Sequence, residues 1–399
     1  MDRPFFSIVI PTKNRSGLLR DAISSVLLQN FDEYELIVSD NFNDERTQNV
    51  VNEFKNDKHL NYIRTDKELN MPDSWEFAAK NAKGIYTLVL SDRAFLKQGA
   101  LSDIYNVIKQ SKEDASVYFW PHGYFDEKKG VLWDEKIEQG VKILKSTDLI
   151  RNYIQTINTN FLPIPTTGCY RFDIAQKIRK DIGRLCMPVS PDCTGLLLLA
   201  YVDPVLYIPR PLVYFQGITA SNLPKIGLNP WPYMNTLDKK DPYQKDPYQF
   251  VPIKAPIVNN LYFNDFLALK KLVGGNLKDI NIDWVLYFVI CYEELIGKMT
   301  IPGVSKEIQL ELLEWWKKTL SNFDEKTQAA VWREIRRRYK NILKSYLRSS
   351  FLGDFLVRIK RFLLGKPTLK YPNALAAGGF SNHIESSYKE VLNAESGRK

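Results

Sequence analysis

The first hundred residues alternate short apolar runs with segments of helical period. The apolar runs are FSIVI, YELIV and IYTLVL, and the stretches between them include LLRDAISSVLLQ, TQNVVNEFK and SWEFAAKNAKG. Strands and helices that alternate at this spacing are typical of βαβ units, which form a parallel sheet. The sequence therefore predicts an α/β fold with a mostly parallel sheet flanked by helices, beginning in residues 1–101.

The composition and periodicity of the sequence change again after residue 101. Residues 102–222 mix helical segments with aromatic strands such as SVYFWPHGYF, and we expect them to pack on the open edge of the sheet. Residues 223–256 are rich in Pro, Lys and Tyr, which indicates a linker or surface loop. Residues 257–372 predict a C-terminal α-helical extension, and 373–399 a loosely ordered tail.

The amino-acid composition favours a globular protein and argues against a zinc-stabilised or disulfide-rich one. An apolar share of 44% in 399 residues supports a buried core. We find no apolar run of about 18 residues and no cleavable leader pattern in MDRPFFSIVIP, so we expect a cytoplasmic protein. Four cysteines without CxxC spacing argue against structural zinc and a disulfide framework, and three histidines exclude a His-rich metal centre.

Polar residues follow three of the predicted strands, at the edge where α/β proteins bind ligands. They are Thr12, Asn14 and Arg15 after Pro11 in PTKNR, Asp40 and Asn41 in VSDN, and Asp92 and Arg93 in SDR. We expect Pro11 to end the first strand, so that backbone N–H groups and a cation at the next helix start can meet a nucleotide. The alternative is an ordinary strand-to-helix loop with Asn14 or Ser16 as the cap.

The order SIVIPTKNR, ELIVSDN, AKGIYTLVLSD and QGAL resembles family 2 glycosyltransferases, which are inverting GT-A enzymes that use nucleotide-diphosphate sugars. The resemblance covers roughly residues 5–222 and implies a GT-A catalytic domain over 1–222, with a donor half (1–101) and an acceptor half (102–222). It implies transfer of a sugar to a hydroxyl of a glycan or lipid-linked acceptor in surface polysaccharide synthesis. A non-catalytic nucleotide-sugar or glycan-binding scaffold on the same fold is the rival hypothesis.

The resemblance also implies roles for two carboxylates. Asp40 is expected to accept the imide N–H of uracil or thymine, which favours UDP or dTDP donors; the alternative is a turn aspartate. Asp192, in SPDCTGLLLLA, precedes an apolar helix and matches the acid that serves these enzymes as the base toward the acceptor hydroxyl. The alternative for Asp192 is a helix cap.

The SDR triplet departs from the acidic DxD triplet of many relatives, whose acids bind Mn²⁺ or Mg²⁺ across the donor phosphates. Asp92 is retained, and Arg93 stands where a second acid is often found. Charge on the leaving diphosphate can come from a metal or from arginine. We favour an ion held weakly by Asp92 with Arg93 assisting, while metal-independent action and a degenerate, inactive protein stay open.

Further expectations concern the acceptor side and the tail. The residues expected to line the acceptor side are Thr166, Thr167, Gly168, Gly217, Ser221 and Asn222. Trp75 and Trp120 are expected to offer stacking faces to a sugar ring, and the alternative for both is a place in the core. Between Val331 and Lys370, twelve Lys/Arg face two acids, so this segment alone exceeds the net charge of +9. Its helix from Phe351 to Leu364 suits either an anionic membrane surface or packing on the catalytic domain. No nucleic-acid motif accompanies the charge, so no nucleic-acid partner is expected.

Overall fold

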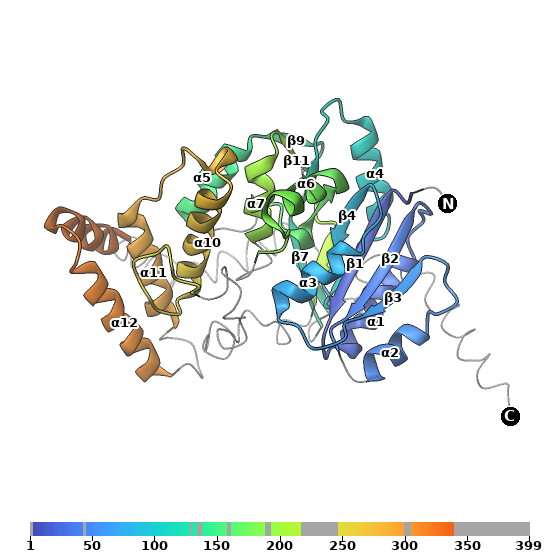
Figure 1. Cartoon of the computed structure of the whole chain (residues 1–399), viewed down its shortest axis with the longest axis horizontal. Coiled ribbons are helices and arrows are strands. Elements are labelled where there is room, and N and C mark those ends of the chain that lie inside the picture. Colours follow the sequence, from blue (N-terminus) through green and yellow to red (C-terminus); the bar gives the residue numbers. More distant parts are fainter. Residues whose placement is uncertain are drawn as a thin grey trace, which may run out of the picture.

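The structure is a computed structural model of the chain (Figure 1). It describes residues 3–42, 45–127, 130–133, 138–157, 161–187, 193–216, 246–298 and 305–338. An α/β unit lies at one end and a group of helices at the other (Figure 1). The predicted basic helix Phe351–Leu364, the tail 373–399 and most of the predicted linker lie outside the described residues. None of the described helices has the length and apolar composition that a membrane crossing requires.

The main sheet has eight strands. Their order is β3 (Leu60–Arg64), β2 (Tyr34–Asp40), β1 (Phe6–Thr12), β4 (Tyr86–Val89), β10 (Gly168–Arg171), β6 (Val117–Phe119), β11 (Val205–Tyr207) and β9 (Lys142–Leu144). The first four strands are parallel, whereas β10 runs antiparallel to both its neighbours and β9 antiparallel to β11. The prediction of a mostly parallel sheet is confirmed, and residues 102–222 extend that sheet beyond β4.

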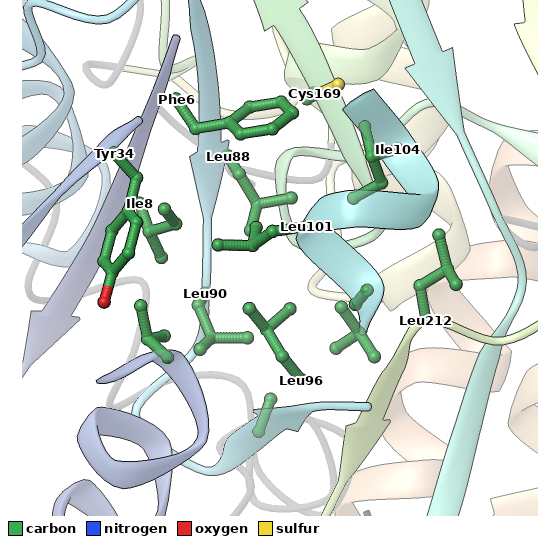
Figure 2. Packing of buried hydrophobic residues seen from close by; sticks show 14 of the residues in the cluster. Phe6, Ile8, Tyr34, Leu88, Leu90, Leu96, Leu101, Ile104, Cys169 and Leu212 are labelled. Carbon is green, nitrogen blue, oxygen red and sulfur yellow. The ribbon is translucent and has the colours of Figure 1, made fainter. Parts of the chain in front are cut away.

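Helices cover both faces of the parallel strands, which explains why β1 is buried along its whole length. On one face lie α1 (Ser16–Leu27), α2 (Glu45–Asn52) and α4 (Ala100–Gln110), packed on alternate residues such as Ile8 and Leu88 (Figure 2). On the other face lies α3 (Met71–Lys80), where Val9 and Ile37 meet Ala78. Successive strand side chains point to opposite faces, so both layers draw on the same short apolar runs.

A second, four-stranded sheet begins at the tip of β4. It consists of β5 (Ala94–Leu96), β12 (Val213–Phe215), β7 (His122–Asp126) and β8 (Val131–Trp133), in that order. Because β5 starts two residues after Asp92, the two sheets meet where that acid lies. This junction places the SDR triplet between the parallel strands and the aromatic strands of the acceptor half.

The remaining helices form two further cores. One contains α5 (Ser146–Thr156), the 3₁₀ turn η2 (Pro165–Thr167), α6 (Phe172–Ile182) and α7 (Thr194–Tyr201). The extension contains α10 (Val258–Leu272), the 3₁₀ turn η5 (Gly275–Leu277), α11 (Trp284–Lys298), α12 (Lys306–Leu320) and a helix over 325–338. Helix α10 belongs to both cores: Phe266 packs with the α7 group, and Phe263 with α11 and α12. The extension is thus docked on the α/β unit through buried side chains.

The helical extension begins earlier in the chain than the sequence predicts. The expected linker 223–256 does not hold for residues 246–256, because Val251, Ile253 and Ala255 are buried in the core of the extension. The apolar residues between its lysines and prolines face inward, and the predicted extension therefore begins before residue 257.

Candidate functional site

Three of the predicted polar residues meet at one edge of the sheet. In the parallel register Thr12 of β1 lies opposite Asp40 of β2, and the Thr12 hydroxyl donates a hydrogen bond of 3.0 Å to Asp92, which follows β4. Strand β1 lies between β2 and β4, so its tip connects the two acids. The strand continues one residue past Pro11, which pairs with Ser39 rather than ending the strand.

The Asp92 side chain is buried and not exposed to solvent. It is 1% exposed, and its second carboxylate oxygen accepts a hydrogen bond of 2.9 Å from Nη1 of Arg15. Burial raises the pKa of Asp92, while the charge of Arg15 and the hydrogen bonds from Arg15 and Thr12 oppose that rise. Arg15 reaches the acid because the chain turns sharply at Asn14, an exposed residue with a left-handed φ of 56°, just before α1.

Arg93 is not the partner of the acid beside it. Its guanidinium lies 4.7 Å from the centre of the Phe215 ring, and its Nη1 donates a hydrogen bond of 3.3 Å to the carbonyl oxygen of Gln216. Both residues lie in the turn between β4 and β5, where Asp92 contacts Thr12 of β1 and Arg93 contacts Phe215 of β12. Arg15, rather than Arg93, pairs with Asp92. A contact of Arg93 with the donor phosphates stays a prediction.

Asp40 is fully buried, and its carboxylate accepts a hydrogen bond of 2.7 Å from the hydroxyl of Tyr62 on β3. Burial and the contact with Asp40 raise the pKa of Tyr62, which keeps the hydroxyl protonated as a donor. Sequence reasoning missed Tyr62. It lies opposite Val38, two residues from the strand tip, and this register was not visible in the sequence.

Asn41 stabilises the loop that follows β3. Its side-chain amide donates to the carbonyl oxygen of Leu69 and accepts from the Leu69 N–H, both at 2.8 Å. The same loop is reached by exposed Lys13, which pairs with Glu68. The structure thus gives Asn41 a structural task, and its contact with a nucleotide stays a prediction.

Comparison with known proteins identifies the domain that carries these strand tips. Residues 7–179 match the model of glycosyl transferase family 2. Residues 7–179 therefore resemble a family 2 glycosyl transferase domain. A segment of 103 residues is 33% identical to the GalNAc(5)-diNAcBac-PP-undecaprenol beta-1,3-glucosyltransferase of Campylobacter jejuni and covers 25% of this chain and 33% of that relative. The matched segment therefore spans about a third of the relative's length.

Two solved structures are also similar to the chain. One is S. aureus TarS 1-349 in complex with UDP-GlcNAc, at 14% identity and a TM-score of 0.48, covering 86% of this chain and 92% of that one. The other is S. aureus TarS, at 14% identity and a TM-score of 0.47, covering 88% and 54%.

The structure describes only part of the predicted acceptor side. Asp192, Gly217, Ser221 and Asn222 lie outside the described residues, whereas Thr166 and Thr167 are buried in η2 and Gly168 begins β10. Trp75 is half-buried. Trp120 is 1% exposed and belongs to the main core, so the expectation that it offers a stacking face to a sugar is wrong.

The arrangement at Asp92 does not fit a divalent ion as it stands. Such ions take several oxygen ligands, and the described residues contain no group of three or more His, Cys, Asp or Glu that could hold one. Both Asp92 oxygens are already engaged, one of them by a cation. A metal role for Asp92 stays a prediction.

Asp40 gives the first mutational test. An Asp40→Ala variant of the domain is expected to bind UDP or dTDP more weakly by roughly 1–3 kcal/mol, the cost of losing a hydrogen bond to a charged group. Because Asp40 is 0% exposed, a base reaches it only after the covering side chains move. Calorimetric titration measures the change, and Asp66→Ala, in the exposed loop after β3, is the control. A loss of thermal stability with unchanged nucleotide affinity would assign Asp40 to the fold alone.

Proposed function

We propose that the chain is an inverting glycosyltransferase that moves a sugar from a nucleotide-diphosphate donor to a hydroxyl of a glycan or lipid-linked acceptor. The observation that carries the proposal is that Thr12 and Arg15 both hydrogen-bond to Asp92. These residues lie beside Asp40, at the carboxyl edge of the sheet in the region that matches the family 2 model. This edge is where open α/β sheets bind their ligands. Family membership alone would support the fold without the reaction.

The donor is of the UDP or dTDP type. A carboxylate has about four lone-pair sites, so Asp40 can hold the Tyr62 hydroxyl and also accept a pyrimidine imide N–H. Cytosine and adenine have no ring N–H on their pairing edge, and guanine carries its N1–H beside an exocyclic amine. Nucleotide panels of UDP, dTDP, GDP, CDP and ADP test this assignment, because a ligand of the folded state raises the melting temperature.

Positive charge for the departing diphosphate comes at least in part from arginine. Arg15 neutralises the buried charge of Asp92, which would otherwise repel the phosphates. Arg93, in the turn after β4, is the arginine proposed to meet the phosphates. The planar fork of a guanidinium suits phosphate oxygens, and a fixed charge stabilises a leaving group without reorganisation. This assignment gives the site a source of charge that does not depend on a bound ion.

The acceptor is lipid-linked, and its product belongs to a surface polysaccharide. The Campylobacter relative carries an undecaprenyl-diphosphate glycan in its name, which supports this class of acceptor for the matched segment. A lipid-linked acceptor lies at a membrane, so we place the protein in the cytoplasm at the inner face, with the basic segment 351–364 as the contact with anionic lipid.

Asp192 is proposed as the base. An Asp192→Asn variant should keep its donor affinity and lose about 10²-fold or more in turnover, because the amide preserves the shape and cannot take the proton. Steady-state release of nucleoside diphosphate measures turnover. Asp181→Asn, on the exposed side of α6, is the control and should be unaffected. A turnover close to that of the wild type would remove Asp192 from the reaction.

A further inference from the structure

Phe42 has a backbone conformation that its residue type rarely adopts. It lies two residues after Asp40, the last residue of β2, and has a left-handed φ of 50°. A positive φ crowds the Cβ of an L-residue against the backbone, so a bulky side chain there is an outlier, whereas glycine adopts it freely. Residues strained in this way persist where the surrounding structure imposes the conformation, often at ligand sites.

Hydrophobic packing does not account for the conformation of Phe42. The residue is 50% exposed, and a single exposed phenylalanine is common on protein surfaces. Among the described residues Ile157 is another apolar residue with a positive φ, but it ends α5 and packs against two hydrophobic cores. Buried contacts can offset the strain at Ile157, whereas half of Phe42 is left to solvent.

The residue before Phe42 is held from two sides. Asn41 is 4% exposed, and its backbone N–H donates a hydrogen bond of 3.0 Å to the carbonyl oxygen of Thr12 on β1. Its side chain makes the two hydrogen bonds to Leu69 in the loop after β3. The chain is therefore fixed directly before Phe42, and the exposed ring extends from a rigid support.

The ring of Phe42 has a cation beside it. The guanidinium of Arg64, at the end of β3, lies over the ring, 5.5 Å from its centre. Arg64 is opposite Asp40 in the register of β2 and β3, and Tyr62, two residues earlier, hydrogen-bonds to Asp40 from the same strand. A guanidinium is attracted to the face of an aromatic ring, so Arg64 holds the Phe42 ring at the strand tip that carries Asp40.

We propose that Phe42 is the stacking face for the pyrimidine base of the donor, beside the acid proposed to accept the imide N–H of that base. The inference rests on the proposed function and names the residue that binds the face of the base. Proteins recognise planar bases by hydrogen bonds along one edge together with stacking on an aromatic ring or a guanidinium. Asp40 offers the first kind of contact, and Phe42 with Arg64 offers the second. A ring held in place before the ligand arrives loses little freedom on binding.

Substitutions of Phe42 separate stacking from a role in the fold. Phe42→Leu keeps an apolar side chain without an aromatic face, Phe42→Tyr keeps the face, and Phe42→Gly relieves the positive φ. Phe161→Leu is the matched control, because Phe161 is also exposed, at 38%. Phe161 lies beside Tyr207 of β11, and five strands of the main sheet separate β11 from β3.

We expect Phe42→Leu to bind UDP about tenfold more weakly by calorimetry, and Phe42→Tyr and Phe161→Leu to stay within about threefold of the wild type. Uridine, measured by competition with UDP, should lose the same factor, because the contact is with the base and not with the phosphates. The comparison is made with dTDP and thymidine if the thymine nucleotide binds more tightly. Phe42→Gly should lose as much affinity, while its melting temperature stays within about 2 °C of the wild type or exceeds it.

Equal UDP affinities of Phe42→Leu and Phe161→Leu would overturn the stacking role and leave the proposed function intact. Weaker binding of UDP with unchanged binding of uridine would also overturn it, since the contact would then be with the phosphates. A lower melting temperature of Phe42→Gly with unchanged affinity would assign Phe42 to the fold. A wild-type chain that binds neither UDP nor dTDP would overturn the donor assignment, and this inference with it.

Discussion

An Asp265→Asn variant is expected to be more stable than the wild type at pH 8 by up to about 4 kcal/mol, and to match it near pH 4. Asp265 on α10 is 2% exposed, and its Oδ2 has no hydrogen-bond partner among the residues that the structure describes. Burial raises its pKa to about 7, against opposing hydrogen bonds with Cys193 and Asn264. Each unit of pKa difference between the folded and unfolded chain is worth about 1.4 kcal/mol.

The raised pKa of Asp265 decides whether folding stability rises or falls with pH. Below the unfolded value of 3.8 the carboxyl is protonated in both states, so it contributes no pH dependence. As the pH rises toward about 7, the unfolded chain releases the proton while the folded chain retains it, and the folded state loses stability. Asparagine cannot ionise, so the variant should lose this part of the pH dependence.

Urea unfolding between pH 4 and pH 8 measures the effect. The exposed Asp279→Asn variant, in the loop after η5, is the matched control and should stay within about 0.5 kcal/mol of the wild type. Parallel pH curves for the wild type and Asp265→Asn would show that Asp265 is not a buried, uncompensated acid. The result bears on function because Asp265 contacts Cys193, at the start of α7.

An Arg15→Met variant is expected to lose about 3 kcal/mol of stability at pH 8, because it leaves the Asp92 carboxylate buried without its cation. We place the loss at the lower end of the range for buried pairs because the Arg15 side chain remains 23% exposed. The loss should shrink as the pH falls and Asp92 takes up a proton. Urea unfolding at pH 8 and pH 5 measures both parts.

Two further variants complete this test. Arg15→Met/Asp92→Asn should recover most of the lost stability, since it removes the charge together with its partner. Lys13→Met breaks the neighbouring Lys13–Glu68 pair, whose side chains are 41% and 63% exposed, and should cost less than about 1 kcal/mol. Equal losses from Arg15→Met and Lys13→Met would mean that Asp92 does not depend on Arg15.

The strand-tip residues were predictable from the sequence because the topology leaves little choice. Parallel strands end at one edge of a sheet, so Thr12, Asp40 and Asp92 had to lie near one another once three strands were recognised. The partner of Asp92 was not predictable from the sequence. Its neighbour Arg93 contacts β12 instead, and its actual partner, Arg15, lies 77 positions earlier in the chain. The order of residues along the chain thus placed the acids at one edge, but it did not reveal which cation pairs with Asp92.

The contacts between α3 and the region of α6 could not be predicted from neighbouring residues in the sequence. Glu76 looks like an ordinary charged residue of an amphipathic helix, but the residues that it hydrogen-bonds lie 103 to 110 positions further along the chain. The docking of the extension was missed for a related reason. The apolar residues Val251 and Ile253 alternate with Pro252 and Lys254, which is typical of a loop, and their burial depends on α11 and α12.

The central claim is that this chain transfers a sugar from a nucleotide donor. Its most direct test is slow donor hydrolysis without an acceptor, measured as nucleoside diphosphate release from a panel of nucleotide sugars, with and without EDTA. The account predicts release from a UDP- or dTDP-sugar, loss of that release in Asp40→Ala, and activity that survives EDTA at least in part. Nucleotide binding without release from any donor in the panel would contradict it, and would favour a non-catalytic scaffold on the same fold.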